Sequence, residues 1–243
     1  MSAALSTHHL VKHYRAGACG KSDLVRALDG VSIDVDEGEI VGVAGARGAG
    51  KSTLLLCAAG LVRPDAGCVR WFGARLDPPA LPPGIAYVPQ RSTYYSFLTV
   101  REALEYYATL HELGTRERAS QVEHAVREVA LSDHVTRRVG CLAPPLLKRL
   151  GLAQALIGAP RALLLDETLD GELTVCLEIR ALLRRLSERG AAILIAAEDP
   201  ARLSNIAHRV VRIAAGRMLS RIETAGFANT PPSRNRRIPL QVS

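Results

Sequence analysis

The pattern of apolar and polar residues along the chain predicts strands that alternate with helices. Short apolar runs rich in β-branched residues indicate strands, whereas apolar residues three and four positions apart indicate helices. The expected strands are 31–35, 39–44, 68–72, 85–88, 162–165 and 191–196, and the expected helices include 51–59 and 177–189. Strands that alternate with helices favour a mostly parallel sheet. We therefore expect an α/β fold.

Two segments depart from this alternation. Between 99 and about 130, apolar residues recur at helical spacing, which predicts a helical subdomain inserted at about 97–158. From 223 to 243 the chain is polar, with a proline pair, an arginine cluster and no apolar period, so we expect a flexible basic tail. Residues 1–222 would then form the folded domain.

Composition narrows the class of protein. With 243 residues, 48% hydrophobic and 23% charged, the chain resembles ordinary folded proteins in composition. The net charge of +7 could favour nucleic acid or an anionic membrane face, but the excess is spread along the chain, and we favour a solvated surface. The five cysteines show no metal-binding spacing and are expected to be reduced thiols.

Localisation is predicted from two negative observations. No uninterrupted apolar stretch approaches the roughly 20 residues that a membrane-spanning helix needs. The segment 1–9 lacks the apolar stretch of a signal peptide. We therefore expect a cytoplasmic chain.

The segment 45–53 fits the phosphate-loop pattern G-x-x-x-x-G-K-[ST] and lies between an expected strand and an expected helix. Its residues are Gly45, Ala46, Arg47, Gly48, Ala49, Gly50, Lys51, Ser52 and Thr53. Glycines let backbone N–H groups point at phosphate oxygens, and the helix N-terminus adds partial positive charge. Lys51 would bridge the β and γ phosphates, Ser52 would coordinate Mg²⁺, and Thr53 would bond a phosphate oxygen. ATP and Mg²⁺ are the expected cofactors, and a chance glycine-rich turn is the alternative.

A second motif follows downstream, where the apolar run 162–165 ends in the adjacent carboxylates of Asp166 and Glu167. With these markers the chain resembles an ATP-binding-cassette (ABC) transporter ATPase from Leu10 to about Ser220. The resemblance also rests on an aromatic residue before the loop, Tyr14. Three later segments support it as well, which are Tyr87-Val88-Pro89-Gln90, Leu98-Thr99-Val100-Arg101-Glu102 and Arg149 to Leu156.

The resemblance implies a P-loop ABC-ATPase fold, with a mostly parallel core, an antiparallel β region and an inserted helical subdomain. It also implies roles for individual residues. Asp166 would hold Mg²⁺ through water, Glu167 would polarise the attacking water, and Gln90 would sense Mg²⁺ and the γ-phosphate beside a transmembrane partner. Tyr14 would stack on adenine, although an ordinary surface tyrosine is the alternative because the insert 15–25 lengthens its distance to the loop.

Three family motifs are degenerate. The expected signature Leu-Ser-Gly-Gly-Gln reads Leu-Ala-Pro-Pro-Leu at 142–146. Ala143 has no hydroxyl, and Pro144 and Pro145 lack N–H groups and are expected to fix the backbone at an extended angle. The segment 168–173 lacks the family's final aspartate, and Glu198 stands where a switch histidine is expected.

These observations predict an exporter-like ATP-binding subunit. It would pair with a second ABC ATPase subunit, as a homodimer or a heterodimer, and would couple ATP binding and hydrolysis to export through a separate transmembrane partner. It would lie on the inner face of the cell membrane, and the degenerate motifs predict slow hydrolysis. The alternative is a regulatory subunit with little or no hydrolysis. A soluble ABC protein acting on DNA or ribosomes is disfavoured because the chain has no second cassette and no long coiled coil, so no nucleic-acid partner is expected.

Overall fold

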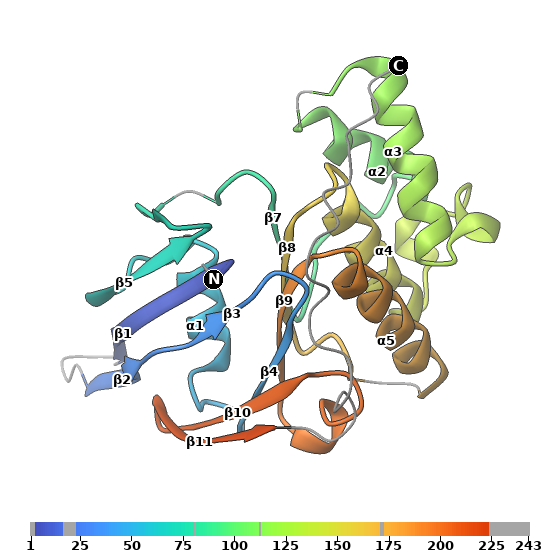
Figure 1. The fold of residues 1–243 in the computed structure, drawn as a ribbon. Helices are drawn as coiled ribbons and strands as arrows, with labels where there is room; N and C mark the ends of the chain where they lie inside the picture. The colour runs from blue at the N-terminus through green and yellow to red at the C-terminus, as the bar shows by residue number, and fades with distance from the viewer. Residues whose placement is uncertain (1–2, 17–22, 80, 112, 171–172, 224–243) are drawn as a thin grey trace.

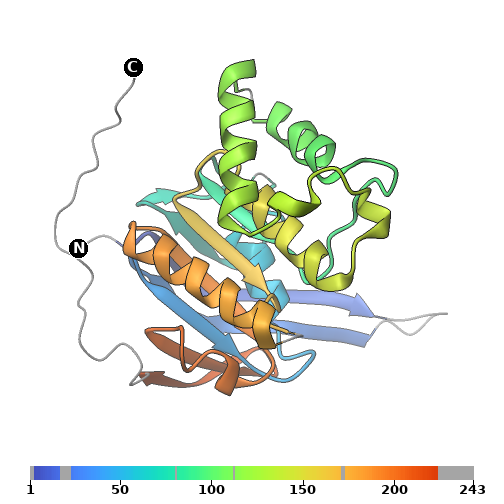
Figure 2. The same cartoon turned by 90° about the vertical axis from the view of Figure 1, so that its right-hand side faces the viewer.

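The fold consists of two β-sheets and a group of helices (Figures 1 and 2). A computed structural model describes residues 3–16, 23–79, 81–111, 113–170 and 173–223. The strands are β1 (Leu5–Ala16), β2 (Asp23–Val31), β3 (Asp34–Val35), β4 (Ile40–Ala44), β5 (Ala66–Trp71), β6 (Ala74–Arg75), β7 (Ile85–Val88), β8 (Ala162–Asp166), β9 (Ala192–Ala197), β10 (Arg209–Ala214) and β11 (Arg217–Glu223). The α-helices are α1 (Lys51–Ala58), α2 (Val100–Thr109), α3 (Thr115–Glu128), α4 (Pro144–Leu156) and α5 (Leu173–Glu188).

The larger sheet has six strands in the order β11-β10-β4-β9-β8-β7. Every neighbouring pair from β10 to β7 is parallel, and β11 pairs antiparallel with β10. All residues of β4, β8 and β9 are buried. Strands that are covered on both faces read as continuous apolar runs. The sequence therefore located these three strands to within one residue at each end.

Helices cover both faces of this sheet. In Figure 1, α4 and α5 lie on one face, and α1 lies on the other face between the two sheets. The hydrophobic core is divided accordingly. One cluster joins the sheet to α2, α3, α4 and α5, and the other joins it to α1 and the smaller sheet. The central strands are therefore packed on both faces.

The smaller sheet is antiparallel, with the order β2-β1-β5-β6 and with β3 on β1. The sequence did not predict β1, because its apolar residues are interrupted by histidine, lysine and threonine and form no apolar run. The predicted strand 31–35 was wrong in its extent, since Val31 closes β2 and only Asp34–Val35 pairs as β3. The predicted strand 85–88 does not belong to this sheet, because it is β7 at the edge of the parallel sheet.

The expected helices of the middle segment are present as α2 and α3. Thr99 begins α2 with a capping box, in which its side chain accepts from the Glu102 N–H and the Glu102 carboxylate accepts from the Thr99 N–H. Leu104 and Val126 are buried in the core cluster of the larger sheet. Both helices and α4 fall within 97–158. The expected tail begins inside β11, which ends at Glu223, and its remaining residues lie outside the described ranges.

Candidate nucleotide-binding site

The phosphate loop connects the end of β4 to the start of α1. Gly50 has a φ angle of 106°, and a Cβ there would lie 2.3 Å from the Ala27 carbonyl oxygen. A Cβ on Gly45 would lie 2.3 Å from the Ile213 carbonyl oxygen. Both positions therefore require glycine, Gly50 because of its conformation and both because of the close backbone approach.

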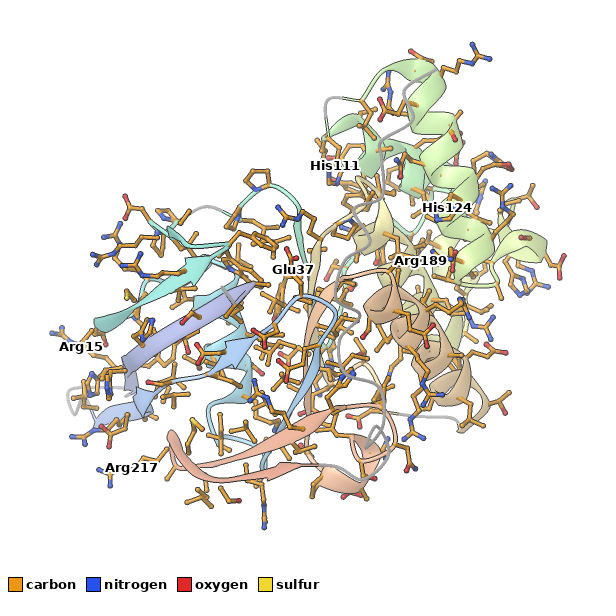
Figure 3. All side chains as sticks on the ribbon, in the orientation of Figure 1. Arg15, Glu37, His111, His124, Arg189 and Arg217 are labelled. Atoms are coloured by element: carbon orange, nitrogen blue, oxygen red, sulfur yellow. The ribbon has the colours of Figure 1, made fainter. Side chains whose placement is uncertain are left out.

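The turn between β10 and β11 fixes the loop against the smaller sheet. The Gly216 N–H donates to the Ala49 carbonyl at 3.0 Å, and the Asp29 N–H donates to the Gly216 carbonyl at 2.8 Å. Arg217 lies beside this turn (Figure 3), and its Nε is 2.6 Å from Asp29 Oδ2. These contacts link the loop, β2 and β11. The loop is thus bonded to the turn before β11, and this turn is also bonded to β2.

The loop leaves several backbone donors available. The Ala49 N–H is used within the loop, where it donates to the Ala46 carbonyl. Within the described ranges, the N–H groups of Gly48, Gly50 and Lys51 donate to no other backbone oxygen. Unsatisfied N–H groups at a glycine-rich loop and helix N-terminus attract anions. The arrangement suits a phosphate chain.

Lys51 and Glu167 form a buried ion pair beside the loop. Lys51 Nζ lies 3.1 Å from Glu167 Oε1, and the two side chains are 5% and 6% exposed. Lys51 Nζ also donates to the carbonyls of Gly45 at 2.7 Å and Ala46 at 3.2 Å. Burial raises the pKa of Glu167, whereas the Lys51 ammonium opposes that increase. The structure therefore brings the predicted phosphate-binding lysine and the predicted catalytic carboxylate into contact.

Glu167 follows Asp166, the last residue of β8, and has a left-handed φ of 52°. A non-glycine residue in this region carries strain and needs surrounding contacts to hold it. Here the Glu167 N–H donates to the Ala196 carbonyl at 3.1 Å, and the Glu167 carboxylate holds Lys51 and accepts from the Glu198 N–H at 3.2 Å. One backbone contact and two carboxylate contacts thus hold Glu167 in place.

Asp166 lies on the same strand end and faces Ser52. Burial raises the pKa of Asp166, and interactions with the Ser52 hydroxyl, the Lys51 ammonium and the Tyr87 hydroxyl act in the opposite direction. Among the residues that the structure describes, no donor satisfies the buried Oδ1 atom of Asp166. A buried carboxylate oxygen without a partner, next to a serine hydroxyl, is the oxygen donor set that Mg²⁺ accepts. The residues fit a magnesium ion.

Gln90 and Tyr14 lie outside this contact network. Gln90 is exposed in the loop after β7 and lines a cavity of about 290 Å³ together with Pro144, Lys148 and Thr168. Tyr14 lies on β1 opposite Val25 and is 38% exposed. For the described residues, no hydrogen bond, ion pair or ring contact joins either side chain to the phosphate loop. Their predicted roles stay predictions.

The degenerate signature forms the start of α4. The prediction of an extended backbone at the prolines was wrong, because Pro144 and Pro145 are the first helical residues and only Ala143 before them is extended, with a ψ of 153°. Proline's fixed φ suits the first turn of a helix, where its missing N–H breaks no intrahelical bond. The Leu146 N–H donates to the Ala143 carbonyl at 2.9 Å. The first three residues of α4 therefore offer no free N–H group to an anion.

Two contacts of the site were not found from the sequence. One is the interaction of the Tyr87 hydroxyl with Asp166. The other is an ion pair between Arg47 in the loop and Glu198 after β9, with 3.5 Å between Nε and Oε1. Both could have been found from strand order, because residues at the carboxyl ends of neighbouring parallel strands meet at one edge of the sheet.

The family model for ABC transporters matches residues 28–170, more than half of the chain, including the phosphate loop and both carboxylates. The chain therefore belongs to the ABC transporter family, and this region is its nucleotide-binding domain.

Individual relatives carry names of the same class. The chain is 29% identical over 218 residues to the uncharacterized ABC transporter ATP-binding protein sll0415 of Synechocystis, covering 88% of this chain and 61% of that protein. It is 33% identical over 221 residues to the methionine import ATP-binding protein MetN of Bifidobacterium longum, covering 87% and 54%. It is 29% identical over 241 residues to a macrolide export ATP-binding/permease protein, MacB 1 of Yersinia pestis, covering 95% and 36%. The chain thus spans less than two thirds of each of these relatives.

Solved structures agree on the fold. A dimeric post-hydrolysis structure of the ATP-binding cassette MJ0796 has a TM-score of 0.82 at 21% identity, with 92% of this chain and all of that chain covered. The structure of cbiO1 from Clostridium perfringens has a TM-score of 0.79 at 24% identity, with 92% and 89% covered. The predicted P-loop ABC-ATPase fold is confirmed.

Proposed function

We propose that this chain is an ATP-binding subunit of an ABC transporter that binds Mg-ATP and couples its binding and hydrolysis to export through a separate transmembrane partner. The observation that carries the proposal is the buried contact between Lys51 and Glu167 beneath a loop with free N–H groups. A lysine and backbone donors bind the phosphates, and the carboxylate next to them can accept a proton.

Ser52 and Asp166 are the residues that would hold Mg²⁺, and Gln90 would reach it from the loop after β7. The ion would neutralise charge on the phosphate oxygens. Glu167 would orient the attacking water and draw charge from its O–H bond. Its raised pKa keeps it closer to the working pH than an exposed glutamate, and the two contacts of its carboxylate restrict its orientation. Tyr14 is proposed as the adenine platform.

An exposed aromatic patch supports a membrane-subunit partner. Aromatic residues make up only 4% of the chain, yet a cluster of them lies on α2 and in the segment between Gln90 and α2. The exposed members, called the aromatic patch below, are Tyr95 (52%), Phe97 (67%) and Tyr106 (43%). Tyr95 contacts both others, with ring centroids 5.7 and 5.8 Å apart. Exposed aromatic clusters are typical anchors of protein interfaces.

The chain would use this patch to bind an apolar segment of a transmembrane subunit. None of the helices in the described part of the chain has the length and apolar character needed to span a bilayer. We infer a position on the inner face of the cell membrane and pairing with a second ABC ATPase subunit. The relatives include proteins named for import and for export, and we favour export because the segment 98–114 resembles exporter-type subunits.

A second candidate function is that of a regulatory subunit with little or no hydrolysis. The observation that favours it is the start of α4, where Pro144, Pro145 and the engaged Leu146 N–H leave no donor for a partner's ATP. Both candidates predict slow turnover, because a homodimer would contain this helix start at both sites.

The experiment is steady-state ATP hydrolysis by the chain purified together with its membrane partner, with Glu167→Gln as the blank. Turnover above the blank supports the ATPase subunit, and turnover equal to the blank supports the regulatory subunit. Phe97→Asp tests the partner surface and should reduce co-purification with the membrane subunit without changing ATP affinity. Leu219→Asp is the matched control, since Leu219 is 64% exposed on β11. Equal loss of co-purification in both variants would exclude the aromatic patch as the binding surface.

A further inference from the structure

An ion pair joins the phosphate loop to the residue after β9. Arg47 Nε lies 3.5 Å from Glu198 Oε1. The pair follows from the topology, because β4 and β9 are parallel neighbours and Ala44 pairs with Ala197. Residues that follow the two strands therefore meet at the same edge of the sheet. Glu198 stands where the family is expected to have a histidine, and the structure places the guanidinium of Arg47 beside its carboxylate.

Glu198 is connected to the buried part of the site as well. Its N–H donates to Glu167 Oε2 at 3.2 Å, while Lys51 contacts the other oxygen of that carboxylate at 3.1 Å. Glu167 would stand at the reacting end of the phosphate chain. Arg47 and Glu198 therefore lie at the terminal-phosphate end of the loop rather than at the nucleoside end.

The contact between Arg47 and Glu198 is weak enough for another anion to replace Glu198. The side chain of Arg47 is 88% exposed and that of Glu198 is 49% exposed, and exposed pairs are weak because water screens them. A guanidinium has five N–H donors and forms strong, often bidentate contacts with phosphate. Across the described residues, Arg47 has no second ion pair. A phosphate with high negative charge can therefore replace Glu198 as its partner.

We propose that Arg47 binds the terminal phosphate of ATP and that Glu198 holds Arg47 when this phosphate is absent, so that the pair makes the site discriminate ATP from ADP. The proposal rests on the proposed function, since it assumes that the loop binds a nucleotide. It also changes the expected role of Glu198. Its carboxylate is not simply a negative charge facing the phosphate, because it pairs with Arg47 in the absence of ATP and competes with the phosphate for this guanidinium.

The test is isothermal titration of the full chain with Mg²⁺ and either ADP or a non-hydrolysable ATP analogue. Arg47→Ala should weaken binding of the analogue about 10-fold, because one charge-assisted contact is lost, and should change ADP binding less than about 2-fold. Arg101→Ala is the matched control. Arg101 and Glu123 form another exposed pair, with 3.7 Å between the groups and exposures of 45% and 51%, and this variant should change neither affinity.

Glu198→Gln provides a second readout that a structural role would not give. It removes the competing anion, so the affinity for the analogue should rise while the affinity for ADP stays the same. In the Arg47→Ala background it should restore part of the lost analogue affinity, because an unpaired Glu198 repels the phosphate. Arg47→Lys should give an intermediate affinity, since it keeps the charge without the planar guanidinium.

Equal effects of Arg47→Ala on the analogue and on ADP, or no effect on either, would overturn the proposal. The proposed function has a separate control in the same experiment. If Lys51→Ala binds both nucleotides as well as the wild type does, the loop is not the nucleotide site and the proposed function fails. If Lys51→Ala loses binding and Arg47→Ala does not, only the inference about Arg47 fails.

Discussion

The buried pair of Lys51 and Glu167 predicts a measurable loss of stability when one partner is removed. Both side chains are almost fully buried, with exposed fractions of 5% for Lys51 and 6% for Glu167. Replacing Lys51 by methionine keeps most of the side-chain volume but leaves Glu167 without its cation. Breaking a buried ion pair in this way costs about 3 to 5 kcal/mol. We expect about 3 kcal/mol, because Glu167 can take up a proton and so avoid part of the cost.

The double variant separates the charge from the packing. With Glu167→Gln also present, no carboxylate is left unpaired, and the total loss in the free energy of unfolding should fall to about 1 kcal/mol. Lys12→Met is the control, because the Lys12 pair with Asp65 is more open to solvent and the change should cost at most about 1 kcal/mol. Urea denaturation of the nucleotide-free chain, followed by circular dichroism, measures all four proteins.

The cost should also depend on pH. Burial already raises the pKa of Glu167, and without the Lys51 ammonium, which opposes this shift, the pKa rises further. The folded variant then binds a proton that the unfolded chain does not, so its stability falls as pH rises through that window. The loss caused by Lys51→Met should therefore be smaller at pH 5 than at pH 7. A loss that is equal at both pH values, with the double variant losing as much stability as Lys51→Met alone, would refute the reasoning.

Three further predictions concern single residues. Asp166→Asn should stabilise the nucleotide-free chain by about 1 kcal/mol and raise its Tm by about 2–4 °C. The reason is that an amide can donate to the Ser52 hydroxyl and that the buried charge is removed. An unchanged or lower Tm contradicts this prediction. Burial lowers the pKa of His208, whose Nδ1 accepts the Ile40 N–H at 2.9 Å. Stability should therefore be lost as pH falls below about 6.5, and His208→Gln should reduce that loss. Equal slopes of stability against pH in the wild type and the variant contradict this prediction. Glu198→His should raise ATP hydrolysis in a heterodimer with an intact partner and do little in a homodimer, and a rate unchanged in the heterodimer contradicts it.

The sequence predicted those parts of the fold that are buried on both faces. The phosphate loop and the strand before Asp166 were found because continuous apolar runs end abruptly in chemically distinct residues. The 12-residue strand β1 was missed because it is a half-polar strand, in which even the buried Thr7 is polar and is satisfied by Ile33. Its neighbour β2 follows closely in the sequence but was not predicted either, and its other long partner, β5, lies far away, so only the assembled sheet reveals β1.

The site was predictable as a set of residues but not as a set of contacts. The carboxylate of Glu167 was expected near the phosphates, yet its pairing with Lys51 depends on the order of β4, β9 and β8 in the sheet. The same order brings Arg47 to Glu198. The prolines of the degenerate signature were expected to be extended, because the residue before a proline usually avoids helical angles. The structure places both in the first helical turn, where the missing N–H groups break no hydrogen bond.

The central claim is that the loop around Lys51 binds Mg-ATP. The most direct measurement is the equilibrium affinity for Mg-ATP of the wild-type chain and of Lys51→Ala, with Lys12→Ala as a control and circular dichroism to show that each variant is folded. The account predicts tight binding by the wild type and the control, and loss of tight binding in Lys51→Ala, because the loop loses its charge on the phosphates. A folded Lys51→Ala protein that binds Mg-ATP with wild-type affinity would contradict the account.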